Sequence, residues 1–115
     1  MDKIAYLEDS DFTSSGQLLI SAPTICLVYA NWCPPCQAFK PTYYELANAV
    51  SNVRISCIEL DGHLPGQKEL ADRIKIILPD LNGTPSIYMF VSGLPVEKYE
   101  GDRTLEGLVA FCSKY

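Results

Sequence analysis

The sequence has few basic residues, no basic cluster and no long hydrophobic run, and each shortage excludes a class of partner. Nine lysines and arginines stand against fourteen acidic residues, giving a formal net charge of −5 at pH 7. Neither a nucleic-acid backbone nor an anionic membrane surface is therefore the expected partner. The longest apolar stretch, Ile25 to Ala30, is too short to span a bilayer.

Export signals are also missing from the sequence. The N-terminal MDKIAYLEDSDF lacks the basic and apolar regions of a signal peptide, and the C-terminal CSKY is not an endoplasmic-reticulum retention signal. The cysteine count is odd and three of the five lie in apolar runs, which is not the pattern of a secreted disulfide framework. We therefore expect a cytoplasmic or other non-secreted compartment. The cysteines are Cys26, Cys33, Cys36, Cys57 and Cys112.

The cysteine and histidine residues of the sequence give little support for a metal site. Zinc usually takes four protein ligands in a structural site, whereas the sequence has one C-x-x-C pair, Cys33 and Cys36, and no second pair to complete the set. The only histidine, His63, lies in the polar turn DGHLPG and is expected to be a solvated loop residue. We expect Cys26, Cys57 and Cys112 to be small core residues, because free cysteine is usually buried. No metal and no cofactor are expected.

Apolar periodicity predicts strands and helices in alternation along one domain, residues 1–115. With 48% apolar residues the chain is large enough to bury a core. The expected strands are Ile4–Leu7, Thr24–Tyr29, Arg54–Leu60, Ser86–Val91 and Val96–Tyr99. The expected helices are Pro34–Val50, Gln67–Ile76, Thr104–Ser113 and a weaker one over Asp11–Leu19. This order, βαβαβ followed by ββα, predicts an α/β fold with a central mixed sheet and helices on both faces.

The C-x-x-C pair falls where the second strand passes into its helix. TICLVY, from Thr24 to Tyr29, is an uninterrupted apolar run typical of a central strand buried on both faces. Reactive groups of open α/β sheets gather at the carboxyl ends of such strands. Pro34 and Pro35 fall in the first turn of the helix, where missing N–H groups cost little, and Pro41 falls in its interior and should bend it.

At this point the sequence resembles the thioredoxin superfamily over nearly its whole length. VYANWCPPC is similar to the strand and active-site motif, Pro41 lies where the family kinks its active-site helix, and Thr84-Pro85 matches its cis-proline. The tail YEGDRTLEGLVAF is similar to catalytic domains of protein disulfide isomerases, and CPPC is similar to the tryparedoxin and nucleoredoxin branch. The resemblance implies a thioredoxin fold and a redox-active cysteine pair.

Disulfide exchange needs an attacking thiolate and a second thiol close enough to resolve the mixed disulfide. Cys33 would lie at the N-terminal edge of a helix, where free N–H groups and the helix dipole stabilise a thiolate. Cys36, one turn deeper, would be the resolving thiol. Pro34 and Pro35 remove two N–H donors, so the N–H of Cys36 should matter more here than in a C-G-H-C site.

The resemblance implies further site residues around the two cysteines. Those expected to bind substrate are Trp32, Thr84, Pro85 and Gly101. Trp32 would form an apolar wall beside Cys33, and Thr84 would offer backbone groups to an extended substrate. Arg103, from the isomerase-like tail, would swing toward Cys36 and favour its thiolate.

The sequence departs from the family in two places. Thioredoxins and disulfide isomerases pair a buried acid with a lysine near the active site, and here those positions hold Leu27 and Cys57. The loss of both partners avoids a buried unpaired charge but removes the usual proton acceptor for Cys36. The stretch IILPDLNG, residues 76–83, also lengthens the approach to Pro85. This insertion either sets partner choice or is a tolerated surface loop.

We therefore predict a thiol–disulfide oxidoreductase acting on protein disulfides through a CPPC dithiol. The alternative is a thioredoxin-fold peptide-binding module whose dithiol is slow or vestigial. A zinc site, or an iron–sulfur cluster shared between two chains, is a minor alternative for the cysteine pair. Expected partners are protein or peptide disulfides or dithiols, and a reductase or glutathione as electron partner. We expect a monomer, and the direction of electron flow depends on a potential that the sequence does not contain.

Overall fold

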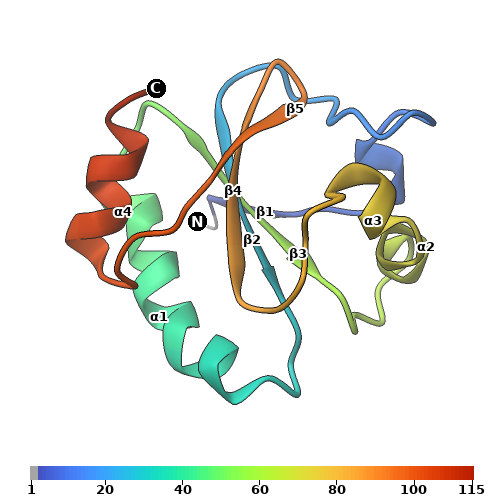
Figure 1. Cartoon of the computed structure of the whole chain (residues 1–115), viewed down its shortest axis with the longest axis horizontal. Coiled ribbons are helices and arrows are strands. Elements are labelled where there is room, and N and C mark those ends of the chain that lie inside the picture. Colours follow the sequence, from blue (N-terminus) through green and yellow to red (C-terminus); the bar gives the residue numbers. More distant parts are fainter. Residues whose placement is uncertain (1–2) are drawn as a thin grey trace.

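A mixed five-stranded sheet with helices on both faces makes up the structure, a computed structural model that describes residues 3–115 (Figure 1). The strands are β1 (Ile4–Tyr6), β2 (Thr24–Tyr29), β3 (Arg54–Glu59), β4 (Ser86–Val91) and β5 (Leu94–Lys98). The helices are the 3₁₀ turn η1 (Asp9–Asp11), α1 (Pro34–Ala49), α2 (Gln67–Asp72), α3 (Ile74–Ile77) and α4 (Leu105–Cys112). The expected α/β architecture is confirmed.

Strand β2 lies at the centre of the sheet. The strand order is β1-β3-β2-β4-β5, in which β1 and β2 run parallel to β3, and β4 runs antiparallel to both β2 and β5. All six residues of β2 are buried, as its apolar run predicted. Because the strand is central, the CPPC segment that follows its carboxyl end lies at the middle of the sheet edge.

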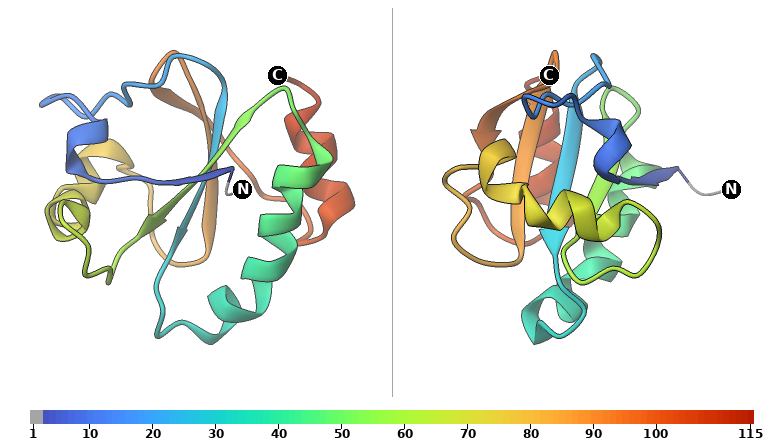
Figure 2. Two further views of the ribbon diagram at one scale, coloured as in Figure 1. Left: turned by 180° about the vertical axis from the view of Figure 1, so that it is seen from behind. Right: turned by 90° about the vertical axis from the view of Figure 1, so that its right-hand side faces the viewer.

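The helices divide between the two faces of the sheet (Figures 1 and 2). Helices α1 and α4 cover one face, where the buried side chains of Leu27, Tyr43 and Leu108 belong to one core cluster. The turn η1 and helices α2 and α3 cover the other face, where Val28 and Leu70 belong to a second cluster. Since side chains alternate along a strand, β2 contributes to both clusters and holds the two layers together.

Helix α1 follows its predicted range to within one residue. Its buried residues include Phe39, Tyr43 and Leu46, the spacing from which one apolar face was predicted. Pro41 lies inside the helix, where it cannot donate a backbone hydrogen bond to the preceding turn. Of the helices formed by residues 3–115, none is long and apolar enough to cross a membrane.

The predicted weak helix over Asp11–Leu19 is wrong. Instead, Phe12 and Leu18 form an isolated antiparallel bridge, and both side chains are buried in the core. The physical reason lies far away in the sequence. The guanidinium group of Arg73 donates hydrogen bonds to the backbone carbonyls of Asp9, Phe12 and Thr13, and these bonds hold the segment in a nonhelical conformation.

The predicted helix over Gln67–Ile76 is interrupted at Arg73. That residue has φ −115° and ψ 21°, outside the helical range, and separates α2 from α3. Local periodicity did not indicate the break, because the apolar residues on either side keep one buried face, which includes Leu70 and Ile74. The short helix α3 therefore starts the stretch that leads to the Thr84-Pro85 loop.

The second strand of the C-terminal hairpin begins at Leu94, two residues earlier than predicted. The turn consists of Ser92 and Gly93 alone, and both have positive φ, 53° and 83°. Two-residue turns of this type match the twist of paired strands. A Cβ atom on Gly93 would lie 2.5 Å from the carbonyl oxygen of Leu18, so this position requires glycine.

Candidate dithiol site

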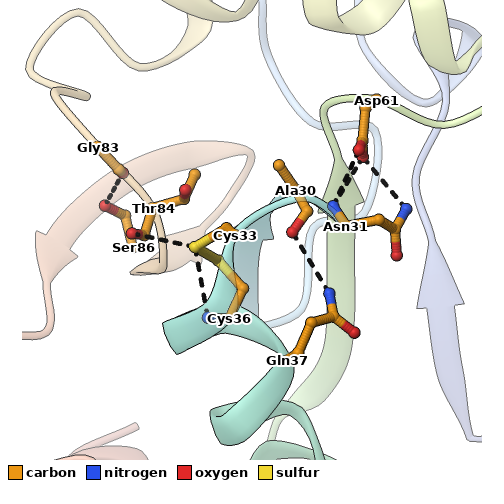
Figure 3. Close-up of a disulfide and its surroundings, with 9 residues drawn as sticks. All are labelled: Ala30, Asn31, Cys33, Cys36, Gln37, Asp61, Gly83, Thr84 and Ser86. Carbon is orange, nitrogen blue, oxygen red and sulfur yellow. Dashed lines mark hydrogen bonds between the residues drawn. A yellow bond between two sulfur atoms is a disulfide. The ribbon is translucent and has the colours of Figure 1, made fainter.

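Cys33 and Cys36 form a disulfide at the start of α1, directly after β2 (Figure 3). Their Cα atoms are 5.2 Å apart. Cys33 retains 4% of its exposure, whereas Cys36 is fully buried. Cys33 is therefore the more accessible residue of the pair, which is the order expected of an attacking and a resolving thiol.

The first turn of α1 directs one hydrogen-bond donor at the sulfur of Cys33. Cys33 is the N-cap residue, and Pro34 and Pro35 occupy the first two helical positions without an N–H group. The first free N–H of the helix belongs to Cys36, and it donates to Cys33 Sγ at 3.3 Å. The geometry predicted from the two prolines is thus present. In the reduced protein this donor and the helix dipole favour a thiolate at Cys33.

The Thr84-Pro85 loop lies against the disulfide. The Thr84-Pro85 peptide bond is cis, as the resemblance implied. Cys33 Sγ lies 3.6 Å from the carbonyl oxygen of Thr84 (Figure 3). The Ser86 hydroxyl donates to the carbonyl of Gly83 at 2.6 Å, and this bond joins the two residues that flank Thr84-Pro85. A chain lying along Thr84 therefore brings its own sulfur close to Cys33.

Trp32 stands beside this loop rather than packing in the core. It is 73% exposed, the highest value among the exposed large apolar side chains. Together with Leu60, Leu81 and Thr84 it lines a pocket of about 320 Å³. Trp32 thus contributes to an apolar pocket that Thr84 also lines, and its predicted role as a wall beside Cys33 stays a prediction.

Gly101 and Arg103 adjoin the Thr84-Pro85 loop in a groove that Trp32 does not line. Both are exposed and line a groove of about 380 Å³ with Thr84, Pro85 and neighbouring residues. Arg103 makes no hydrogen bond or ion pair with any residue in the range 3–115, and so none with Cys36. The structure therefore places both residues beside the Thr84-Pro85 loop, and their predicted roles stay predictions.

The two positions that depart from the family lie directly opposite each other. Leu27 in β2 pairs with Cys57 in β3 in the parallel register, and both are fully buried. No charged side chain occupies this pair of positions. An acid introduced at either would be a buried charge without a partner.

The loop before Trp32 is held in place by two carboxylates, Glu59 and Asp61, which the sequence analysis did not identify. The backbone N–H of Asn31 donates to both carboxylate oxygens of Asp61 at 3.0 Å, and its side-chain amide donates to Asp61 at 3.2 Å (Figure 3). The same amide also donates to Glu59. Tyr29 donates its hydroxyl proton to Glu59 at 3.1 Å. In the sequence, only Glu59 and Asp61 at the end of β3 and Asn31 after the end of β2 indicated this network.

The remaining three cysteines lie in the core. Cys26, Cys57 and Cys112 are all fully buried, as predicted for core residues. Burial raises the pKa of Cys26 to about 12 and that of Cys112 to about 11. We expect iodoacetamide at about pH 8 to label at most the two CPPC cysteines of the reduced native protein. Mass spectrometry would count the labels, and labelling in concentrated urea, where all five should react, is the control.

The same burial predicts a loss of stability at high pH. When the protein unfolds, the pKa values of the Cys26 and Cys112 thiols return toward the ordinary value of 9.0, so the unfolded chain ionises first. The contribution of these two thiols to the free energy of unfolding is therefore complete below about pH 9. As the pH rises toward their pKa values in the folded protein, this contribution falls by about 1.4 kcal/mol per pH unit for each thiol. Urea titrations at several pH values would measure the slope, and a flat profile above about pH 9 would contradict it.

Metal-ligating side chains do not converge in the part of the chain that the structure describes. Between residues 3 and 115 no three histidine, cysteine, aspartate or glutamate side chains lie together in a way that would hold an ion. His63 is exposed in its turn. The cysteine pair stands apart as the one group in residues 3–115 arranged for exchange chemistry.

Comparisons with known proteins agree with this geometry. A profile of the thioredoxin family matches residues 3–114. The chain is 33% identical over 86 residues to Protein disulfide isomerase-like 1-3 of Arabidopsis thaliana, covering 75% of this chain and 14% of that protein. It is 31% identical over 98 residues to a putative protein disulfide-isomerase of Schizosaccharomyces pombe, covering 84% of this chain and 18% of that protein. The chain thus spans less than a fifth of either relative.

A solved structure shows the same fold. The crystal structure of the J-Trx1 fragment of ERdj5 superimposes with a TM-score of 0.74 and 29% sequence identity. The superposition covers 97% of this chain and 49% of that fragment. Spinach chloroplast thioredoxin f superimposes with a TM-score of 0.69 at 18% identity, a likeness of fold alone, covering 97% of this chain and 85% of the other.

Proposed function

This chain belongs to the thioredoxin family, and from that membership we propose that it exchanges disulfides with protein or peptide substrates through Cys33 and Cys36. Thiol–disulfide oxidoreductase activity in general follows from the family and from the cysteine pair, which forms a disulfide. The proposal concerns the substrate and the role of each thiol. The observation that supports it most is the N–H of Cys36, which is directed at Sγ of Cys33, the more accessible residue of the pair.

In the reducing direction, the Cys33 thiolate attacks one sulfur of the substrate disulfide. A Cys33–substrate disulfide forms, and the other substrate sulfur leaves as a thiolate and takes up a proton. The Cys36 thiol then loses its proton and attacks Cys33 Sγ, which closes the intramolecular disulfide and releases the second substrate thiol. Two electrons pass from the protein to the substrate, and the oxidising direction reverses each step.

The insulin reduction assay tests this proposal. We expect the protein to accelerate the reduction of insulin by dithiothreitol, because the dithiol exchanges with the protein disulfide faster than the small thiol does. A variant with both Cys33 and Cys36 replaced by Ala sets the baseline rate. Equal rates for the two proteins would refute the proposal and leave the peptide-binding module, which the buried Leu27–Cys57 pair in place of an acid and a lysine favours.

We also propose that Arg103 assists turnover by approaching Cys36. Arg103 is exposed, has no hydrogen-bond or ion-pair partner in residues 3–115, and lies on a segment that borders the Thr84-Pro85 loop. A guanidinium group near a sulfur atom favours its thiolate. We expect Arg103→Ala to slow reoxidation of the dithiol by glutathione disulfide by about threefold to tenfold, one charge interaction being lost. Stopped-flow fluorescence measures the rate, Arg54→Ala is a control far from the site, and an unchanged rate would remove Arg103 from the mechanism.

The compartment and the electron partner complete the proposal. We infer a reducing compartment, since Cys26, Cys57 and Cys112 lie in the core outside the Cys33–Cys36 disulfide. A reductase or glutathione would then return the Cys33–Cys36 disulfide to the dithiol. A reduction potential near or below about −270 mV would suit a reductase, and one near about −180 mV would suit an oxidase or isomerase.

A further inference from the structure

The ammonium group of Lys40, in the second turn of α1, lies over the ring of Tyr29 on β2. Lys40 Nζ is 4.5 Å from the centre of the Tyr29 ring and 6.0 Å from the centre of the Tyr44 ring. The faces of aromatic rings attract a cation electrostatically. Among residues 3–115 no carboxylate lies within ion-pair distance of this ammonium group. The rings therefore hold the charge of Lys40 in place without neutralising it.

Helix geometry directs Lys40 toward the dithiol. Lys40 follows Cys36 by four residues in α1, so the two residues lie one turn apart on the same side of the helix. A long side chain in a helix points back toward the N-terminus and covers the preceding turn. For Lys40 that turn contains Cys36 and Gln37, and the Gln37 amide donates to the carbonyl of Ala30, just after β2, at 3.4 Å (Figure 3). The charge of Lys40 is therefore carried over the turn that contains the resolving thiol.

The Tyr29 ring under this charge is fixed. Its side chain belongs to the same buried cluster as Cys33 and Cys36. Its hydroxyl donates to Glu59 on the neighbouring strand β3 at 3.1 Å, and Glu59 also accepts from the side chain of Asn31. Because the ring is packed in the core and its hydroxyl is hydrogen-bonded, the position of the ammonium group is set before a substrate arrives.

The titratable side chains around Lys40 come from four elements of the fold. They are Tyr29 on β2, Cys57 and Glu59 on β3, Tyr44 on α1 and Tyr6 on β1, whose hydroxyl donates to that of Tyr44 at 3.2 Å. Burial raises the pKa values of Tyr29 and Tyr44 above their usual range, and the Glu59 carboxylate raises that of Tyr29 further. Both phenols therefore stay protonated between about pH 6 and pH 9, and neither adds a pH dependence to the dithiol in that range.

We propose that Lys40 assists the resolving step by stabilising the Cys36 thiolate. This inference rests on the proposed disulfide exchange at Cys33 and identifies a positioning residue for its second step. The uncharged pair of Leu27 and Cys57 cannot supply this stabilisation. An ammonium group one helical turn away from the thiol favours its charged form.

The step is an ordinary thiol–disulfide exchange. The Cys36 thiol gives its proton to the solvent, and the thiolate attacks Cys33 Sγ. The bond between Cys33 and the substrate sulfur breaks as the bond between Cys33 and Cys36 forms. The substrate sulfur leaves as a thiolate and takes up a proton. Lys40 keeps its own proton throughout and contributes only its charge.

The pH dependence of the resolving step tests this inference. Prereduced protein is mixed with excess 5,5′-dithiobis(2-nitrobenzoate) in a stopped-flow spectrophotometer. Attack by Cys33 releases one coloured thiolate, and attack by Cys36 on the mixed disulfide releases a second in a phase whose rate is independent of reagent concentration. We expect Lys40→Met to raise the apparent pKa of this second phase by about one pH unit and to slow it about threefold at about pH 7. The rate falls less than the thiolate fraction does, because a thiolate of higher pKa is more nucleophilic.

Two control variants separate charge from packing. Lys40→Arg keeps the charge and should keep the pKa of the second phase. Lys68→Met changes the net charge equally at an exposed site on α2 and should also leave this pKa unchanged. At a pH above the pKa of both proteins, Lys40→Met should resolve as fast as the natural chain, which a packing defect would not allow. An unchanged pKa in Lys40→Met, or an equal change in Lys40→Arg, would overturn the inference.

Tyr29→Phe distinguishes the charge from a proton relay through the hydroxyl. The variant keeps the ring that holds Lys40 and removes only the hydrogen bond to Glu59. We expect the pKa and the rate of the second phase to stay as in the natural chain. Slow resolution in Tyr29→Phe together with normal resolution in Lys40→Met would assign the role to the hydroxyl and contradict the inference.

The first phase separates this inference from the function on which it rests. No release of the coloured thiolate from the reagent, together with no insulin reduction, means that the proposed function has failed. A normal first phase, insulin reduction and an unchanged second phase in Lys40→Met mean that only the role of Lys40 has failed.

Discussion

Replacing Cys36 by Ser is expected to convert turnover into covalent capture of substrate. Cys33 would still attack, because the donor to its sulfur is the backbone N–H of residue 36, which the substitution leaves in place. The mixed disulfide would then persist, since no second thiol can attack it. Nonreducing electrophoresis with insulin as substrate should show a stable adduct that dithiothreitol releases.

The reciprocal variant is the matched control. Cys33→Ser should form no adduct and lose about a thousandfold or more of the insulin reduction rate, because the sulfur that substrates reach is absent. Cys36 is fully buried and cannot take over. Adducts of equal yield from Cys33→Ser and Cys36→Ser would show that the roles of the two thiols have been assigned wrongly.

Replacing Leu27 by Asp is expected to lower the free energy of unfolding by about 3 to 5 kcal/mol at neutral pH. Leu27 is fully buried in the central strand, and its partner in the register, Cys57, carries no compensating charge. The introduced carboxylate must either ionise without a partner or stay protonated at a cost in free energy. Urea unfolding followed by circular dichroism measures the change.

Two companion variants separate charge from shape at this position. Leu27→Met keeps the volume and should cost less than about 1.5 kcal/mol. Adding Cys57→Lys to Leu27→Asp should restore about 2 kcal/mol or more, because the ammonium group then faces the carboxylate. Equal losses for Leu27→Met and Leu27→Asp would show that the site tolerates an unpaired acid. The double variant also provides a proton acceptor near the dithiol, so its rate of mixed-disulfide resolution can be compared with that of the natural chain.

The sequence predicted those parts of the molecule that local patterns determine. TICLVY marked the central strand because a strand buried on both faces must be apolar throughout, and it was correct at both ends. CPPC marked the helix start and the hydrogen bond to Cys33, because proline at the first two helical positions leaves few other donors. The cis Thr84-Pro85 bond was expected from the resemblance.

Features that depend on distant contacts were missed or wrong. The helix predicted over Asp11–Leu19 does not form, and Arg73 instead binds the carbonyls of Phe12 and Thr13 in a contact that nothing within that segment signals. The network of Asn31 with Glu59 and Asp61 depends on two strand ends lying side by side. The pocket at Trp32 likewise combines residues from three separate stretches, so its shape followed only from the fold.

The central position of β2 has a consequence for local opening of the protein. A strand paired on both edges and buried along its whole length exchanges its amide hydrogens only when much of the domain opens. The loop that carries Cys33 is continuous with this strand, so we expect it to unfold together with the most stable cooperative unit of the domain. Hydrogen exchange should therefore find the edge strands β1 and β5 opening while the cysteine pair remains assembled, and mild destabilisation should reduce the amount of folded protein before it reduces the activity of each folded molecule.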